Sequence, residues 1–92
     1  MEVTVKLGGQ VFRFGPHCER DTDTIMQDYP NPLDATWRQM HLAASRAEPG
    51  LSFDAFMERW HKAAARGATL APLLHAMNRA YASDYDNDAT VN

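Results

Sequence analysis

The residues of this chain that could carry chemistry are one cysteine and four histidines. Cys18 directly follows His17, and a thiol near an imidazole can form a cysteine nucleophile or the start of a zinc site. The other histidines, His41, His61 and His75, fall in separate helical segments without the short paired spacing of zinc ligands. We therefore interpret Cys18 as a packed or exposed thiol, and we expect no enzyme activity, no metal site and no cofactor.

Three aspartates near the end of the sequence have the first spacings of a calcium-binding loop. Asp84, Asp86 and Asp88 match its first three ligand positions, but Ala89 replaces the required glycine and no bidentate glutamate follows. No glycine-rich phosphate loop and no G-x-S-x-G motif occurs. We interpret residues 84–92 as an acidic, disordered tail.

Three cations share one side of a predicted helix that begins after residue 52. Arg59, Lys62 and Arg66 lie toward its C-terminal end, where the helix dipole favours positive charge. They form either a solvated helix face or a basic edge for an acidic partner or nucleic acid. The net charge of −3 argues against nucleic acid. A helix-turn-helix would also offer only Asn78 and Arg79, far from the start of its recognition helix.

The elements that position these residues begin with a β-hairpin over residues 3–14. Polar and apolar residues alternate on both sides of Gly8-Gly9, which suits a two-residue primed turn because both turn positions need positive φ. This turn pairs residue 7 with 10, residue 5 with 12 and residue 3 with 14. One face then carries Val3, Val5, Leu7, Phe12 and Phe14, and the other carries Thr4, Lys6, Val11 and Arg13.

An isolated hairpin is marginally stable in water, so other parts of the chain must cover its apolar face. Helices can cover a face, whereas only another strand can pair with a strand edge. The hairpin edge therefore favours either a homo-oligomer or the capture of an extended partner segment by strand addition. An edge left to water is an equal alternative.

Three amphipathic helices are predicted after residue 31, and a fourth, short helix within residues 18–28 is left open. Asn31-Pro32 and Ser52 are start signals, Pro49-Gly50 and Gly67 are stop signals, and Thr69 precedes the last helix. Helical spacing predicts three apolar stripes. These are Leu33, Trp37, Met40, Ala44 and Ala47; Phe53, Phe56, Met57, Trp60 and Ala64; and Leu70, Leu73, Leu74, Met77 and Tyr81.

The expected fold class is α+β, mainly α, with an N-terminal hairpin followed by three to four short helices in a small bundle over residues 32–82. A chain of 92 residues makes one domain, placed at residues 1–83, with a modest core. The lone cysteine permits no internal disulfide, and no apolar run has the length of a signal peptide core or a membrane span. We expect a cytoplasmic protein that does not enter membranes.

The order of these elements resembles the tail assembly chaperones of long-tailed bacteriophages. The resemblance covers residues 3–66. It rests on Leu7-Gly8-Gly9-Gln10-Val11-Phe12, on a helix with Trp37-Arg38 and Ser45-Arg46-Ala47, and on Pro49-Gly50-Leu51-Ser52-Phe53-Asp54-Ala55-Phe56. It implies a non-enzymatic protein of the host cytoplasm that keeps the tape measure protein soluble and helps recruit tail tube subunits during virion tail assembly.

Such a protein needs apolar and edge surface that is free to meet a protein partner. The candidate partner-binding residues are Val11, Arg13, Trp37, Met40, Arg59, Lys62 and Arg66. The competing interpretation is a small phage or plasmid regulator that inhibits a host protein or nucleic-acid machinery. It would act through a charged face, either Arg59, Lys62, Arg66 and Arg79 or the acidic tail.

Overall fold

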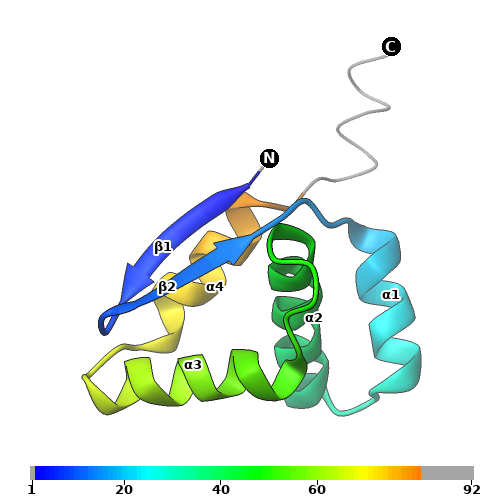
Figure 1. Cartoon of the computed structure of the whole chain (residues 1–92). Helices are drawn as coiled ribbons and strands as arrows, with labels where there is room; N and C mark the ends of the chain where they lie inside the picture. The colour runs from blue at the N-terminus through cyan, green and yellow to red at the C-terminus, as the bar shows by residue number, and fades with distance from the viewer. Residues whose placement is uncertain (1, 82–92) are drawn as a thin grey trace.

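The computed structural model describes residues 2–81 as a β-hairpin lying over helices (Figure 1). The elements are β1 (Val3–Leu7), β2 (Gln10–Phe14), α1 (Glu19–Asp28), α2 (Pro32–Ala47), α3 (Phe53–Ala65) and α4 (Leu70–Arg79). The expected α+β, mainly α class is therefore confirmed, with four helices after the hairpin. The predicted tail at 84–92 and its aspartates lie outside the described residues.

The hairpin has the register that its turn chemistry predicts. Val3 pairs with Phe14, Val5 with Phe12 and Leu7 with Gln10. The two turn glycines have positive φ, at 53° for Gly8 and 79° for Gly9. Gly8 also sits so close to the backbone of Ala63 in α3 that a Cβ there would overlap it. The turn thus needs glycine for its dihedral angles and for its contact with α3.

The predicted helix boundaries follow from capping. The Asn31 side chain accepts hydrogen bonds from the amides of Leu33 (2.9 Å) and Asp34 (3.2 Å), and Pro32 occupies the first turn of α2. The Ser52 hydroxyl accepts from the Ala55 amide at 3.1 Å. Thr69 precedes α4 as predicted, but its side chain makes no capping hydrogen bond.

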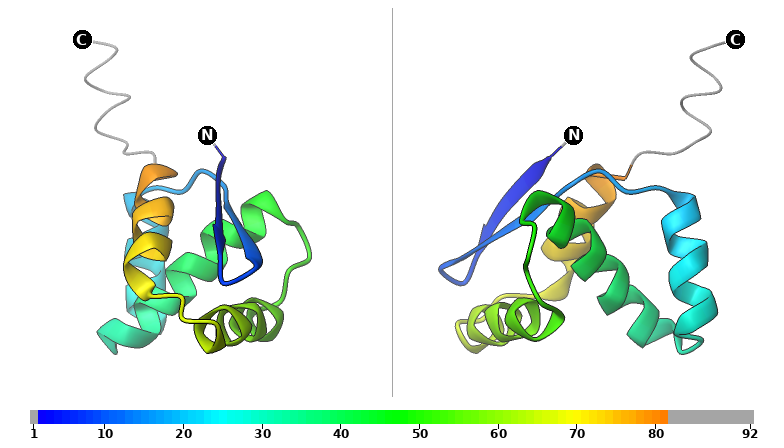
Figure 2. Two further views of the ribbon diagram at one scale, coloured as in Figure 1. Left: turned by 90° about the vertical axis from the view of Figure 1, so that its left-hand side faces the viewer. Right: turned by 45° about the vertical axis from the view of Figure 1, so that its right-hand side comes forward.

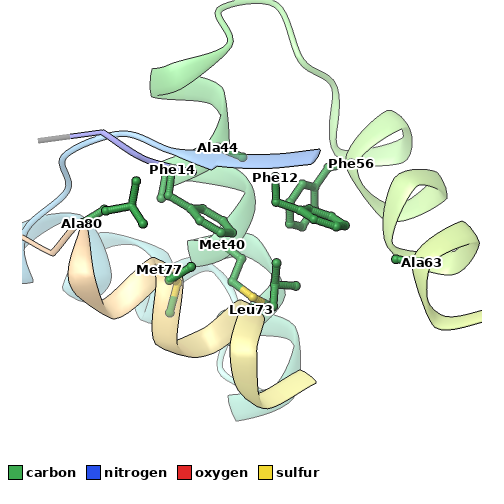
Figure 3. Close-up of a cluster of buried hydrophobic side chains, with 12 residues drawn as sticks. Phe12, Phe14, Met40, Ala44, Phe56, Ala63, Leu73, Met77 and Ala80 are labelled. Atoms are coloured by element: carbon green, nitrogen blue, oxygen red, sulfur yellow. The ribbon is translucent and has the colours of Figure 1, made fainter. Parts of the chain in front are cut away.

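The core lies between the hairpin and the helices (Figure 3). Phe12 and Phe14 point down from β2 and meet Phe56 of α3 edge-on, with ring centroids 6.1 Å and 6.5 Å apart. Met40 of α2 and Leu73 of α4 complete this fully buried group. Edge-to-face packing lets the aromatic rings fill this space with favourable contacts.

Two of the predicted apolar stripes need correction. The helical spacing predicts Leu33 on the buried stripe of α2, but Leu33 is 64% exposed, because it lies in the first turn of α2, at the end away from the hairpin (Figure 1). Ala64 is exposed, and its neighbour Ala63 is buried instead, because Ala63 is the residue that meets Gly8 in the hairpin turn.

The helix left open at residues 18–28 is present as α1. It lies on the side of α2 away from the hairpin (Figures 1 and 2) and has no fully buried residue. Asp21 in its first turn receives two hydrogen bonds from Arg46 of α2, both 2.9 Å long. α1 is therefore attached by this ion pair and by half-buried side chains.

Candidate protein-binding surface

His17 and Cys18, which suggested chemistry in the sequence, make contacts within the fold. His17 is 1% exposed, with Nδ1 3.2 Å from the Gly15 carbonyl oxygen and its ring edge-on to Tyr81. Burial lowers the pKa of His17, and its Nε2 has no hydrogen-bond partner. Cys18 precedes α1, with its thiol 3.5 Å from an oxygen of Asp21. His17 and Cys18 thus hold the segment between β2 and α1 in place.

The other histidines are dispersed. His41 Nε2 lies 2.7 Å from the Leu51 carbonyl oxygen, and its ring contacts Phe53. His61 and His75 are exposed on α3 and α4. Within residues 2–81, no group of three His, Cys, Asp or Glu side chains is placed to hold a metal ion.

Arg59, one of the candidate partner-binding cations, is engaged within the chain. It donates to both carboxylate oxygens of Glu48, at 2.8 Å and 3.1 Å, and to the Val11 carbonyl oxygen at 3.2 Å. The hydrogen bond to Arg59 lowers the pKa of Glu48 and raises the pKa of Arg59. Arg59 therefore joins α3 to the end of α2 and to β2.

The remaining candidate cations lie at separate places. Arg13 pairs across the outer face of the hairpin with Glu2, at 2.6 Å. Lys62 pairs with Glu58 one turn earlier on α3, at 3.5 Å, with both side chains exposed. Arg66 lies beside Gly9 at the hairpin turn. Of the cations in the regulator interpretation, Arg59 is thus held by other segments, and Lys62 pairs within its own helix.

The two edges of the hairpin differ. At β2, the outward Val11 carbonyl accepts from Arg59, and the Gly15 amide donates to the Ala43 carbonyl of α2 at 2.7 Å. At β1, the described part of the chain supplies no strand other than β2 and no backbone hydrogen bond to the outer edge. The edge without a backbone hydrogen-bond partner among the described residues is therefore that of β1, the strand against which α4 packs (Figures 1 and 2).

The apolar candidates for partner binding differ in how far they are exposed. Met40 is 0% exposed, so its place among the partner-binding residues is a correction: it packs in the core and cannot touch a partner. Trp37 is half-buried and contacts Trp60 of α3, with ring centroids 5.6 Å apart. Val11 is 46% exposed on the outer hairpin face.

Sequence reasoning missed Leu33 as a surface residue. It precedes Trp37 by four residues, so the two side chains share one face of α2. We call Leu33, Trp37 and Trp60 the apolar strip; it leads from the exposed first turn of α2 to α3. The position of Leu33 immediately after the N-cap and proline was the available signal, because first turns often extend past the core.

Comparison with family models, curated proteins and solved structures finds no match to this chain. The longest described helix has 16 residues, and no helix among residues 2–81 has the length and apolar character of a membrane span. The fold and the apolar strip define a small, mainly helical α+β domain with a candidate protein-binding surface.

Proposed function

We propose that this chain is a non-enzymatic tail assembly chaperone of a bacteriophage, acting in the host cytoplasm on the tape measure protein or the tail tube protein. The observation that carries the proposal is the apolar strip. Leu33 is 64% exposed, and Trp37 and Trp60 are covered only in part. An exposed leucine that continues into two partly buried tryptophans offers a contiguous apolar surface to another protein.

The shape of the strip favours a helical partner. Leu33 and Trp37 are one turn apart on α2, and Trp60 adds an aromatic surface from α3. An amphipathic helix that presents apolar residues every three or four positions can lay them along such a surface. The tape measure protein of this phage class, which is long and helical, is the partner we expect.

Co-expression tests the proposal. Candidate tape measure segments should become soluble when this chain is present. Leu33→Glu should abolish the rescue, because it places a charge in the contact. That substitution should not harm folding, since Leu33 is exposed and an acidic residue in the first turn suits the helix dipole.

Ala55→Glu is the matched control, because it also puts an acid into the first turn of a helix at an exposed residue away from the strip. It should rescue solubility as well as the unmodified chain does. Absence of rescue by the unmodified chain with every segment contradicts the proposal, as does equal rescue by Leu33→Glu.

A further inference from the structure

We propose that two copies of this chain pair through the outer edge of β1 and form a four-stranded antiparallel sheet in the order β2-β1-β1-β2. The chain covers part of the other edge itself, through Arg59 on the Val11 carbonyl and through the Gly15 amide on the Ala43 carbonyl. The outward amides and carbonyls of β1 have no such partner among the described residues, and Thr4 and Lys6 are exposed. α4 packs against the same strand (Figure 2, left).

The register of the hairpin decides which backbone groups face outward. The two-residue turn makes Leu7 and Gln10 a hydrogen-bonded pair, so Val5 and Val3 also direct their amides and carbonyls toward β2. The amides and carbonyls of Thr4 and Lys6 therefore point to the open edge, ready to pair with another strand.

The charges on this edge are self-complementary. In an antiparallel pair with its two-fold axis at Thr4, each Thr4 faces its copy, each Glu2 faces Lys6 of the other copy, and each Val3 faces Val5. Lys6 forms no ion pair within the described chain. In this register, each of the two Lys6 side chains of the dimer faces Glu2 of the other copy. Moving the axis to Val3 or Val5 removes both charge pairs.

The side chains on the two faces permit this arrangement. Glu2 holds Arg13 through one carboxylate oxygen and is still exposed, so its second oxygen is free for Lys6 of the other copy. On the inner face, the half-buried Val5 of each copy gains a cross-strand contact with Val3 of the other copy. The paired segment is short, so we expect reversible association that depends on protein concentration.

Sedimentation velocity of the full chain over a concentration series tests the proposal through charge exchange. Lys6→Glu places Glu2 opposite a glutamate, and Glu2→Lys places Lys6 opposite a lysine, so each variant alone should stay monomeric. Mixed in equal amounts they should form heterodimers, because one pair is then the original Glu2–Lys6 pair and the other is restored with its signs exchanged. The unmodified chain should shift from monomer to dimer as its concentration rises.

Lys62→Glu and Glu58→Lys are the matched controls, because they change the net charge equally on the exposed side of α3. Each control should dimerise like the unmodified chain. In the unmodified protein, amide exchange at Thr4 should slow as the concentration rises, by about tenfold when the dimer dominates.

Three results would overturn the proposal. One is an unmodified chain that stays monomeric up to its solubility limit. The second is dimerisation of both charge variants alone. The third is a mixture of the two variants that remains monomeric while each variant keeps a folded hairpin by NMR. None of these results depends on whether the apolar strip binds a phage protein, so this proposal and the proposed function can fail separately.

Discussion

At the scale of single residues, several arginines of this protein join its own segments. Arg46 joins α2 to Asp21 of α1 and to the Pro16 carbonyl oxygen. Arg38 lies between two rings, with Cζ 3.7 Å from the centroid of Phe53 and 4.7 Å from that of Tyr29. Arg38 and Arg46 are therefore engaged within the chain, by side chains that are distant from them in the sequence.

The Arg59–Glu48 pair gives a first prediction at this scale. Glu48→Gln should lower the free energy of unfolding by about 1–2 kcal/mol, because the bidentate, partly buried ion pair loses its charge. The exposed pair of Lys62 and Glu58 provides the control, and Glu58→Gln should change stability by less than about 0.5 kcal/mol. Urea denaturation measures both values, and equal losses would contradict the assigned role of Arg59.

His17 gives a second prediction, in the pH dependence of stability. Burial lowers its pKa in the folded state, so below about pH 6.5 the unfolded chain binds a proton that the folded chain does not. Stability should therefore fall as the pH drops from about 7 to about 5, within the usual range of histidine titration.

Thermal unfolding at several pH values checks the role of His17. The fall between about pH 7 and pH 5 should be reduced in His17→Gln and retained in His61→Gln, since His61 is exposed on α3. A fall of the same size in His17→Gln would show that another group carries the pH dependence.

At the scale of elements, the hairpin is positioned by its contact with α3. Gly8 combines a positive φ with close packing against the Ala63 backbone, whereas Gly67, with φ 90°, has open space around its Cβ position. The hairpin turn and the C-terminal end of α3 are therefore in direct contact, which keeps the apolar face of the hairpin over the helices (Figure 2).

Alanine substitutions at Gly8 and Gly67 separate the cost of a positive φ from the cost of overlap with α3. Gly67→Ala should cost about 1–2 kcal/mol, the cost of the left-handed conformation alone. Gly8→Ala should cost more, because its Cβ must also displace α3. Denaturant titration of both variants gives the comparison, and a smaller cost at Gly8 would contradict the close approach.

At the scale of the whole molecule, the local sequence predicts where strands and helices begin and end. Contacts between distant segments determine which face of each helix is buried. Gly8-Gly9 and Asn31-Pro32 specify the hairpin register and the start of α2 because each acts on its own neighbours. The exposure of Leu33 and the burial of Ala63 depend on where the hairpin ends above the helices. Helical periodicity contains no information about that position, which is why the candidate surface was only partly predictable.

The proposed function rests on the claim that the chain binds another protein through the apolar strip, and tryptophan fluorescence measures this binding. The chain has two tryptophans, so Trp60→Phe leaves Trp37 as the single reporter. Titration with a helical tape measure segment should shift the emission of Trp37 to shorter wavelength and saturate, because the exposed part of its indole becomes covered. Binding of the segment, established by co-sedimentation, with unchanged Trp37 emission would contradict the claim.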